Sequence, residues 1–345
     1  MSLTNDAPAE KGGAKREKTN MMRSGKTVLA FAALLGLGVA TAAWAQDAKY
    51  PAYPMKTVTL LSSSGPGGGG DVFLRQLTKV LGPRWGINLV VENVTGGGGT
   101  NALRRIVEGP KDGSLLYGGN TQHLITSVLS TPPYTYKDLQ PVANVLLDAP
   151  VFYVRSDSPF KNLGDIVEYS RKNPGKLKFG SATASSPDRM AVETFKRLNK
   201  LEMVVATHDS GGQLLISVLS GAVDAGTADI QEVASQVEAG KVRILAALTE
   251  QRIPGYPDIA TAKEQGTDVV VNQFRGIVGA KGLPPEVVKA WEEAIQLVLK
   301  DPEYKAQLTK NGQIAAYWGA KDYDTKTNEY VTNISVFFKQ IGLIN

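Results

Sequence analysis

The chain of 345 residues contains no cysteine, which excludes disulfide bonds and metal sites built on thiolates. It also excludes a lipid anchor on a cysteine at a cleaved N-terminus. Beyond residue 45, no segment resembles a stop-transfer signal. From these absences we expect a protein without a metal or other cofactor that is not anchored in a membrane.

The chain also has little net positive charge once the N-terminal segment is set aside. The full sequence carries 38 Lys and Arg against 33 Asp and Glu, a net charge of +5. The first 45 residues hold six of the basic and three of the acidic residues, which leaves +2 for the remainder. No basic stretch is interleaved with aromatic residues, so a nucleic-acid partner is not expected.

The first 45 residues have the pattern of an export signal. A basic start around Arg23 is followed by an apolar run over residues 28–40 and by the small-x-small pattern Ala43-Trp44-Ala45. We expect cleavage after Ala45. The mature chain, residues 46–345, is then expected to be a soluble monomer in a bacterial periplasm.

The stretch from Thr57 to Asn93 indicates a strand, a glycine-rich turn, a helix and a second strand. The first N–H groups of a helix lack partners, and the helix dipole makes that end positive, so the turn suits a phosphate or a carboxylate. Asp71 is better suited to capping its own helix, because two negative charges in contact repel. The expected ligand contacts here are Ser62, Ser63, Ser64, Gly65, Gly67, Gly68, Gly69, Gly70 and Asp71.

Two other interpretations of this turn stay open. Gly65, Gly67 and Gly70 satisfy the dinucleotide fingerprint, with Glu92 near the position of the acid that binds the ribose. The segment could also be a tight turn without a ligand. A phosphate-binding loop of the nucleotide triphosphatase type is excluded, because no lysine follows the turn.

A second glycine turn, residues 95–101, opens another helix, and a strand at 114–118 leads into the polar group 120–123. Open α/β sheets bind ligands at the carboxyl ends of their strands, so Thr121 is a candidate contact. His123 has no neighbouring Asp, Glu or His and is expected to be structural.

The second half of the chain repeats this chemistry with hydroxyl groups. A strand at 177–180 ends in a turn rich in Ser and Thr, where Ser186 is a good N-cap and Pro187 a good first helical residue. Capping alone does not require the other hydroxyl groups of the turn. The expected ligand contacts from this half are Ser181, Thr183, Ser185, Ser186 and Asp229.

The sequence His208-Asp209-Ser210 invites comparison with a catalytic triad. Neighbours in sequence seldom give triad geometry, and no nucleophile-elbow motif is present. We expect Ser210 instead to cap the helix 213–219, which Gly221 ends in the left-handed conformation.

The last third of the chain begins with a proline-containing connector, residues 253–266, expected to return to the first half of the fold. A strand-like segment, 269–278, contains Arg275. This side chain could pair with an acidic ligand as a fork donor, or with solvent or a carboxylate of the protein. Three helices are expected to finish the chain, at 285–299, 302–310 and 322–341.

Taken together and in order, several motifs resemble the substrate-binding proteins of the tripartite tricarboxylate transporter family, the Bug or TctC-like receptors. They are Tyr53-Pro54-Met55-Lys56, Pro66 to Asp71, Val90 to Gly98, Pro110 to Gly113, Ser220 to Asp224 and Gly240 to Arg243. The resemblance implies an α/β fold of two lobes, of the type II-like periplasmic binding protein kind, with the ligand cleft between them. We expect residues 46–148 in lobe 1, 149–248 in lobe 2 and 249–345 in lobe 1 again.

The resemblance further implies capture of a small organic carboxylate and its delivery to integral-membrane permease subunits. The ligand-facing loops depart from the family pattern at residues 62–65, 208–211 and 274–276, and Asp188 stands where a histidine is common. The sequence therefore leaves the substrate open. It also leaves open a ligand sensor for a membrane signalling partner. A nicotinamide-dependent enzyme is disfavoured by the export signal.

Overall fold

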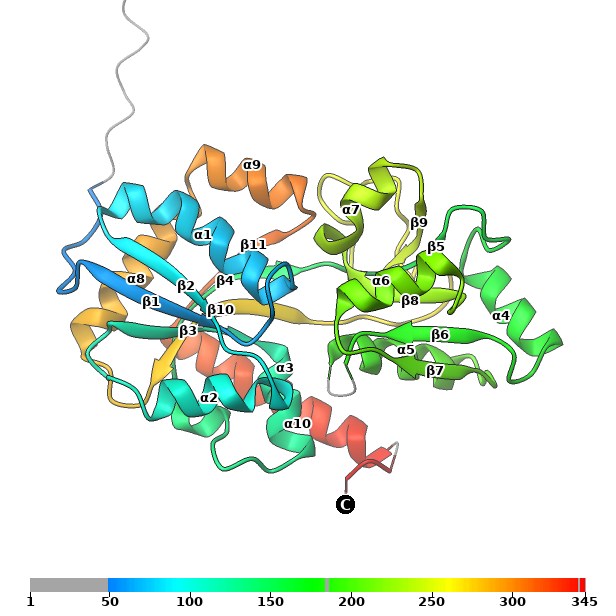
Figure 1. Ribbon diagram of the computed structural model, residues 1–345, viewed down its shortest axis with the longest axis horizontal. Coiled ribbons are helices and arrows are strands. Elements are labelled where there is room, and N and C mark those ends of the chain that lie inside the picture. The colour runs from blue at the N-terminus through cyan, green and yellow to red at the C-terminus, as the bar shows by residue number, and fades with distance from the viewer. Residues whose placement is uncertain (1–48, 184–185, 341, 345) are drawn as a thin grey trace, which may run out of the picture. The chain divides into compact units, whose positions relative to one another are not determined.

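The computed structural model describes residues 49–183, 186–340 and 342–344. The expected export signal, its cleavage site and Ser185 lie outside these ranges. The described chain forms two α/β lobes, each built around its own mixed sheet (Figure 1). None of the described helices is both long and apolar enough to cross a membrane.

Lobe 1 contains a sheet of six strands in the order β11-β4-β10-β3-β1-β2, in which β1 pairs in parallel with β2 and β3. The strands are β1 (Thr57–Ser62), β2 (Asn88–Asn93), β3 (Leu115–Asn120), β4 (Leu139–Asp148), β10 (Gln273–Ala280) and β11 (Ile314–Gly319). The helices are α1 (Gly69–Trp85), α2 (Thr100–Val107), α3 (Thr121–Leu129), α8 (Pro285–Val298), α9 (Pro302–Lys310) and α10 (Ala320–Gln340), with the short 3₁₀ turns η1 (Gly97–Gly99) and η2 (Tyr136–Asp138).

Lobe 2 contains a sheet of five strands in the order β7-β6-β8-β5-β9, in which β6 pairs in parallel with β7 and β8. The strands are β5 (Pro150–Arg155), β6 (Lys178–Ser181), β7 (Val204–Thr207), β8 (Ala225–Asp229) and β9 (Val242–Ala247). The helices are α4 (Leu163–Lys172), α5 (Pro187–Leu198), α6 (Gly211–Ser220) and α7 (Ile230–Glu238). The expected two-lobed α/β fold is confirmed.

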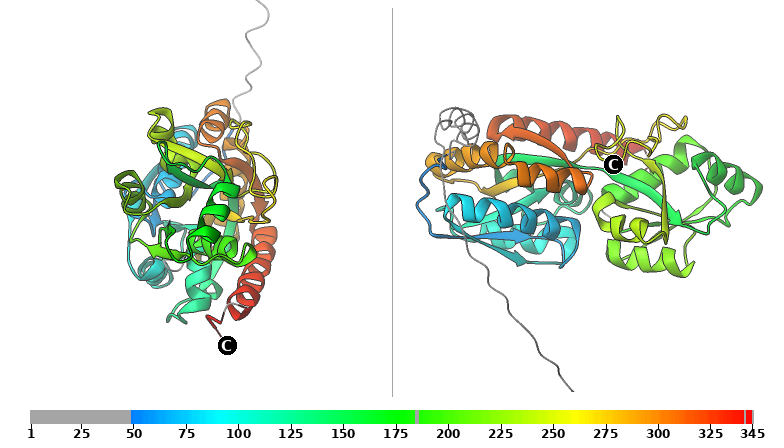
Figure 2. Two further views of the ribbon diagram at one scale, coloured as in Figure 1. Left: turned by 90° about the vertical axis from the view of Figure 1, so that its right-hand side faces the viewer. Right: turned by 90° about the horizontal axis from the view of Figure 1, so that it is seen from above.

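The chain passes between the lobes twice, as the view from above shows (Figure 2). The first crossing is abrupt, because a single residue, Ala149, separates β4 of lobe 1 from β5 of lobe 2. The second crossing leads into β10. The connector before it, expected in lobe 1, packs on lobe 2 instead, because Ile253, Ala262 and Val269 are buried among lobe 2 residues. The strand expected from residue 269 therefore starts only at Gln273, where pairing with β4 begins.

Each lobe has its own apolar core, as the sequence periodicity predicts. In lobe 1, α1 buries Phe73, Leu77 and Leu81 at helical spacing. Trp85 at its end meets Trp291 of α8 edge to face, with ring centroids 5.0 Å apart. In lobe 2, three phenylalanines form the corresponding cluster: Phe152, Phe179 and Phe195.

Strand β11 was not expected from the sequence. It lies at the edge of the lobe 1 sheet, and its residues alternate between half-buried and exposed positions. Such a strand lacks the continuous apolar run that marks β1. Its position is decided by pairing with β4, a partner more than a hundred residues earlier in the chain.

Candidate ligand-binding cleft

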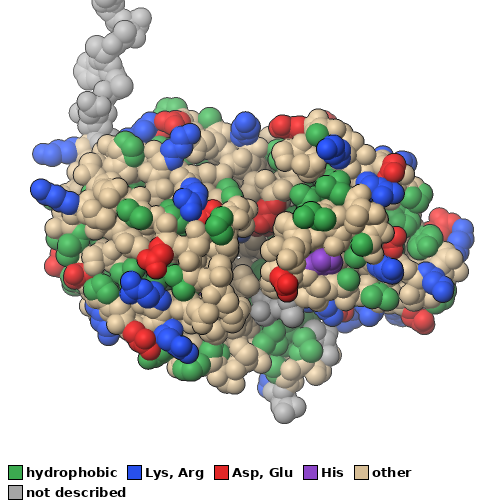
Figure 3. All heavy atoms as spheres, viewed as in Figure 1, with side chains coloured by type: hydrophobic (Ala, Val, Ile, Leu, Met, Phe, Trp, Pro, Cys, Tyr) green, Lys and Arg blue, Asp and Glu red, His purple; other side chains and the backbone are tan. Residues whose placement is uncertain are grey.

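A cleft of about 990 Å³ lies between the lobes and is lined from both sides. Lobe 1 contributes the loops that follow β1, β2 and β3, and lobe 2 contributes those that follow β6, β7 and β8. Each group is a set of parallel strands whose carboxyl ends meet at one edge, the usual binding edge of such sheets. The space-filling view shows the hollow between the lobes with acidic side chains at its edge (Figure 3).

The first glycine turn forms the lobe 1 side of the cleft, and several of its N–H groups already have partners. Gly67 donates to the Asp71 carboxylate at 3.0 Å, and Gly70 donates to Ser64 Oγ at 3.3 Å. Asp71 also accepts from Arg75 and Asn93 and does not line the cleft. Burial alone would raise the pKa of Asp71, but these hydrogen bonds lower it, so its charge serves the turn itself.

Gly69 is one of the points at which the two lobes meet across the cleft. Its N–H group, at the start of α1, donates to Glu232 Oε1 of α7 at 3.1 Å. A β-carbon at this position would lie 2.3 Å from Arg275 Nη2 and 3.1 Å from an oxygen of Asp229. Glycine is therefore required here by close approach.

Arg275 is buried at the floor of the cleft, with only 5% of its surface exposed. Its Nε binds Asp148 at the end of β4, and its Nη2 binds Asp229 at the end of β8, at 2.8 Å. Burial by itself would lower the pKa of Arg275, but the carboxylates of Asp148, Asp229 and Glu232 outweigh it and raise this pKa above its usual value. Of the alternatives drawn from the sequence, pairing with protein carboxylates is the one observed.

A ring of glutamine side chains completes this buried ion pair. Gln273 Nε2 donates to both carboxylate oxygens of Asp229, at 2.9 and 2.8 Å. Gln313 and Gln231 donate to Asp148, at 2.9 and 3.3 Å. The network connects β4 and β10, the strands at which the chain crosses between the lobes, to β8 and α7 of lobe 2. It therefore holds the two lobes together at the floor of the cleft.

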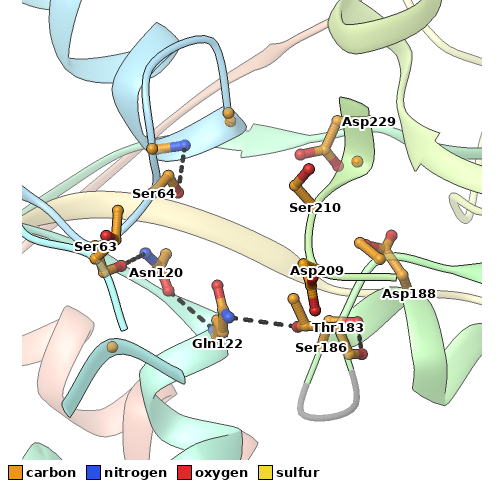
Figure 4. Close-up of a pocket in the computed structure, with 18 of the residues that line it drawn as sticks. Ser63, Ser64, Asn120, Gln122, Thr183, Ser186, Asp188, Asp209, Ser210 and Asp229 are labelled. Carbon is orange, nitrogen blue, oxygen red and sulfur yellow. Dashed lines mark hydrogen bonds between the residues drawn. The ribbon is translucent and has the colours of Figure 1, made fainter. Parts of the chain in front are cut away.

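The β3–α3 junction supplies a polar wall from lobe 1 (Figure 4). Asn120 caps α3 and donates to Ser63 Oγ at 3.3 Å. Thr121 and Gln122 line the cleft, and Gln122 reaches Thr183 of lobe 2 at 3.4 Å. His123 completes the capping box, and burial lowers its pKa to about 3, so it is neutral and structural as expected.

In the hydroxyl-rich turn of lobe 2, some residues cap helix α5 and some line the cleft. Ser186 accepts from Arg189 N–H as the N-cap of α5, with Pro187 in the first turn as expected. Thr183 and Ser186 line the cleft, whereas Ser181 is fully buried behind it. In lobe 1 Ser62 is likewise turned inward and donates to Ser64 O at 3.2 Å.

The residues His208, Asp209 and Ser210 form no catalytic arrangement. The His208 ring nitrogens contact Ser181 O and Ser217 Oγ, at 3.3 and 2.9 Å. Ser210 accepts from the Gln213 N–H and caps α6, which Gly221 ends at a φ of 77°. Both caps are therefore confirmed, and the helix between them runs from Gly211 to Ser220, slightly longer than expected.

Asp188 and Glu232 line the cleft but were not among the expected contacts. Burial and the neighbouring Glu232 raise the pKa of Asp188 to about 7. Glu232 carried a signal in the sequence, because it follows Asp229 by three residues at a helix start, and such residues share a face. Asp188 also carried a signal, because it directly follows the N-cap Ser186 and the first helical residue Pro187, at the start of α5. Of the expected contacts, those that line the cleft are Ser63, Ser64, Gly65, Gly67, Gly68, Gly69, Gly70, Thr121, Thr183, Ser186, Asp229 and Arg275.

Comparison with known proteins identifies the family. Residues 73–343 match the model of the tripartite tricarboxylate transporter family receptor, TctC. A Cupriavidus necator protein of the gbd 5′ region is 27% identical over 323 residues, which cover 92% of this chain and 95% of that protein. The BugT protein of Bordetella pertussis is 25% identical over 74% of this chain and 80% of its own length.

Solved structures share the fold. A periplasmic transporter superposes with a TM-score of 0.79 at 25% identity, covering 85% of this chain and 99% of that one. An R. palustris protein solved with adipate gives 0.80 at 22% identity, over 84% and 99% of the two chains. MatC from Rhodopseudomonas palustris, solved with malate, gives 0.73 at 23% identity, over 81% and 98%.

The family match excludes the nicotinamide-dependent enzyme that the sequence left open. TctC proteins are receptors of a transport system and are not enzymes, so the dinucleotide fingerprint in the first glycine turn does not mark a dehydrogenase. The chain belongs to the TctC family of tripartite tricarboxylate transporter receptors.

Proposed function

We propose that this receptor encloses one small organic carboxylate between its lobes in the periplasm and delivers it to the permease subunits of its transporter. The observation that carries the proposal is the Glu232 carboxylate bound to the Gly69 N–H group at 3.1 Å. The Glu232 oxygens stand where carboxylate oxygens of a ligand would bind. The start of α1 thus accepts a carboxylate from across the cleft in this structure.

The electrostatics of the lobe 1 wall support the same assignment. Backbone N–H groups at the start of α1 carry the positive end of the helix dipole, and the turn after β2 brings a second glycine run to the cleft. Ser63, Asn120 and Gln122 add neutral polar groups that can donate hydrogen bonds. Two structural relatives, solved with adipate and with malate, are consistent with a carboxylate ligand.

The proposed place and partner rest on the leader pattern and the family. The sequence of residues 1–45 favours export, and a structural relative is described as a periplasmic transporter. The family is named for a transporter of which this chain is the receptor component. A soluble receptor that closes around its ligand would present the closed lobes to the permease.

Calorimetric titration with mono-, di-, tricarboxylic and aromatic acids tests the proposal. One acid should bind per chain and be recovered unchanged. Gly68→Val should then weaken binding about thirtyfold or more, equivalent to about 2 kcal/mol, because a branched side chain disturbs the turn that presents the Gly69 N–H group. A β-carbon at Gly68 would lie 3.1 Å from Ser64 Cβ.

The control is Gly221→Ala, which strains the left-handed end of α6 away from the cleft. This variant should lose stability but keep the affinity of the wild type. If Gly68→Val folds and binds like the wild type, the carboxylate does not bind at this turn.

A further inference from the structure

The cleft carries more negative charge than a receptor for simple carboxylates requires. Four acidic residues line it, Asp188, Asp209, Asp229 and Glu232, and among the described lining residues Arg275 is the only Lys or Arg. That guanidinium is already bound by Asp229 and by Asp148 behind the cleft. A ligand with two or three carboxylates would therefore enter a site with no free cation among the residues that the structure describes.

Three of these acids lie at the starts of two lobe 2 helices, and Figure 4 shows two of them, Asp188 and Asp229. Asp188 lies in the first turn of α5, Asp229 is the N-cap residue of α7, and Glu232 follows in the first turn of α7. The Asp188 carboxylate accepts from Thr227 Oγ1 at 3.4 Å, a long hydrogen bond. The positive ends of the helix dipoles favour the ionised carboxylates, but burial still raises the pKa of Asp188 and of Glu232. The negative charges of these two residues are therefore only partly compensated by the protein.

An unpartnered acceptor lies beside this cluster. Gln273 lines the cleft, is only 8% exposed and holds Asp229 through its amide nitrogen. Its Oε1 has no hydrogen-bond partner within the described part of the chain. This acceptor without a donor lies beside a group of acidic residues whose only Lys or Arg partner in the described lining is Arg275, bound to Asp229. The arrangement favours a ligand that is rich in N–H groups and positively charged.

A metal ion does not fit this role. Among the residues that the structure describes, no group of three or more His, Asp or Glu side chains is arranged to hold a metal. Asp229 and Glu232 are each engaged with the protein, through Arg275 and Gly69 respectively. An organic cation needs only hydrogen-bond contact with such carboxylates, not convergent coordination.

We infer that the ligand is a small zwitterion, whose positively charged nitrogen binds between Asp188 and Glu232 while its carboxylate binds at the start of α1. The inference rests on the proposed function and adds a positive charge to the carboxylate ligand. On binding, the ligand carboxylate replaces Glu232 at the Gly69 N–H group. The released Glu232 carboxylate then faces the ligand nitrogen, so one side chain serves both the ligand-free and the bound state.

Matched acids with and without the nitrogen test this inference by calorimetric titration. The sets are 4-aminobutanoate, succinate and butanoate; 6-aminohexanoate, adipate and hexanoate; glutamate and glutarate; and 4-(aminomethyl)benzoate and terephthalate. In the set that fits the cleft, the nitrogen-bearing acid should bind at least about tenfold tighter than the matched diacid, equivalent to about 1.4 kcal/mol.

Two substitutions locate the nitrogen. Asp188→Asn should weaken binding of the zwitterion by about tenfold or more and change binding of the matched monocarboxylate much less. Glu232→Gln also removes the carboxylate that occupies the Gly69 N–H group, so its measure is the ratio of zwitterion affinity to monocarboxylate affinity, which should fall about tenfold or more. The matched controls are Glu238→Gln, exposed on the same helix α7, and Asp258→Asn, exposed on the connector. Neither control should change the affinity for any probe.

The pH dependence separates a bound cation from a shared proton. Asp188 is influenced by Glu232 of α7, Arg275 of β10 and Asp148 of β4, and its pKa is raised to about 7. A bound ammonium favours the ionised form, so affinity should rise between pH 6 and pH 8. A diacid that accepts a proton from neutral Asp188 would show the opposite slope.

The outcomes distinguish the two proposals. Tighter binding of a diacid than of its zwitterionic partner, or affinity that falls with rising pH, overturns the zwitterion and leaves the carboxylate receptor standing. Binding of hexylamine as tightly as 6-aminohexanoate overturns the carboxylate receptor and keeps the cation site. If no acid of any set binds, both proposals are wrong.

Discussion

Replacing Arg275 by methionine should reveal how much the buried ion network supports the fold. Methionine keeps an unbranched side chain of similar length but removes the guanidinium that binds Asp148 and Asp229. Both carboxylates are almost fully buried, at 2% and 4% exposure. The glutamines that hold them continue to donate, but they bring no positive charge.

The size of the loss follows from charge separation and burial. Opposite unit charges about 4 Å apart attract by about 4 kcal/mol at an effective dielectric constant of about 20. Removing one partner of a buried pair typically costs about 3–5 kcal/mol, because the other charge is left without compensation. We expect Arg275→Met to lower the free energy of unfolding by about 3 kcal/mol at pH 8.

The same loss should shrink at pH 5. Burial and the neighbouring Asp148 already raise the pKa of Asp229 well above its usual range, and removal of Arg275 raises it further. When a carboxyl group has a higher pKa in the folded than in the unfolded state, the protein becomes less stable as pH rises from the unfolded-state pKa toward the folded-state pKa. Protonation of Asp229 at pH 5 therefore removes part of the buried negative charge that Arg275 no longer neutralises.

Urea unfolding at both pH values measures these differences. Trp85, Trp291 and Trp318 all lie in lobe 1, so fluorescence must be combined with far-UV circular dichroism, which reports both lobes. The double variant Arg275→Met/Asp229→Asn should recover at least about 1 kcal/mol relative to the single variant at pH 8. A loss that is equal at both pH values, or a double variant that is simply additive, would refute the reasoning.

Two further predictions test residues around the network. Gly69→Ala should lower the melting temperature, with a cost of about 1–3 kcal/mol, because its β-carbon would lie 2.3 Å from Arg275 Nη2. The control Gly212→Ala has only Ser210 Oγ within 4 Å, at 3.9 Å, and should be neutral or stabilising, so equal melting of Gly69→Ala and wild type would contradict the packing. Asp188→Asn should stabilise the ligand-free protein more at pH 8 than at pH 5, by at least about 1 kcal/mol, because a raised pKa makes the ionised carboxylate costly above its unfolded value. Chemical denaturation at both pH values checks this difference, and an effect independent of pH, like that expected of Asp258→Asn, would contradict it.

The sequence by itself determined most local elements of this protein, with β11 and α4 as exceptions. The strand–turn–helix units, the caps at Ser186 and Ser210 and the left-handed end at Gly221 all appear where they were expected. These features depend on hydrogen bonds and backbone angles within a few residues, so the pattern of neighbouring side chains is enough to specify them. The expected family also follows from motifs that are continuous in the chain.

Only the tertiary structure decided how charge is arranged in the cleft. Gly69 and Glu232 are 163 residues apart in sequence, and Arg275 lies 127 residues from Asp148. Their pairing depends on which strand ends the two sheets bring together, and no local pattern encodes that. The same reason explains why Ser181, adjacent in sequence to residues that line the cleft, is buried behind it. Local rules placed the helix starts at Pro187 and after Ser210, but packing between the lobes decided which charges the helix starts of the cleft meet.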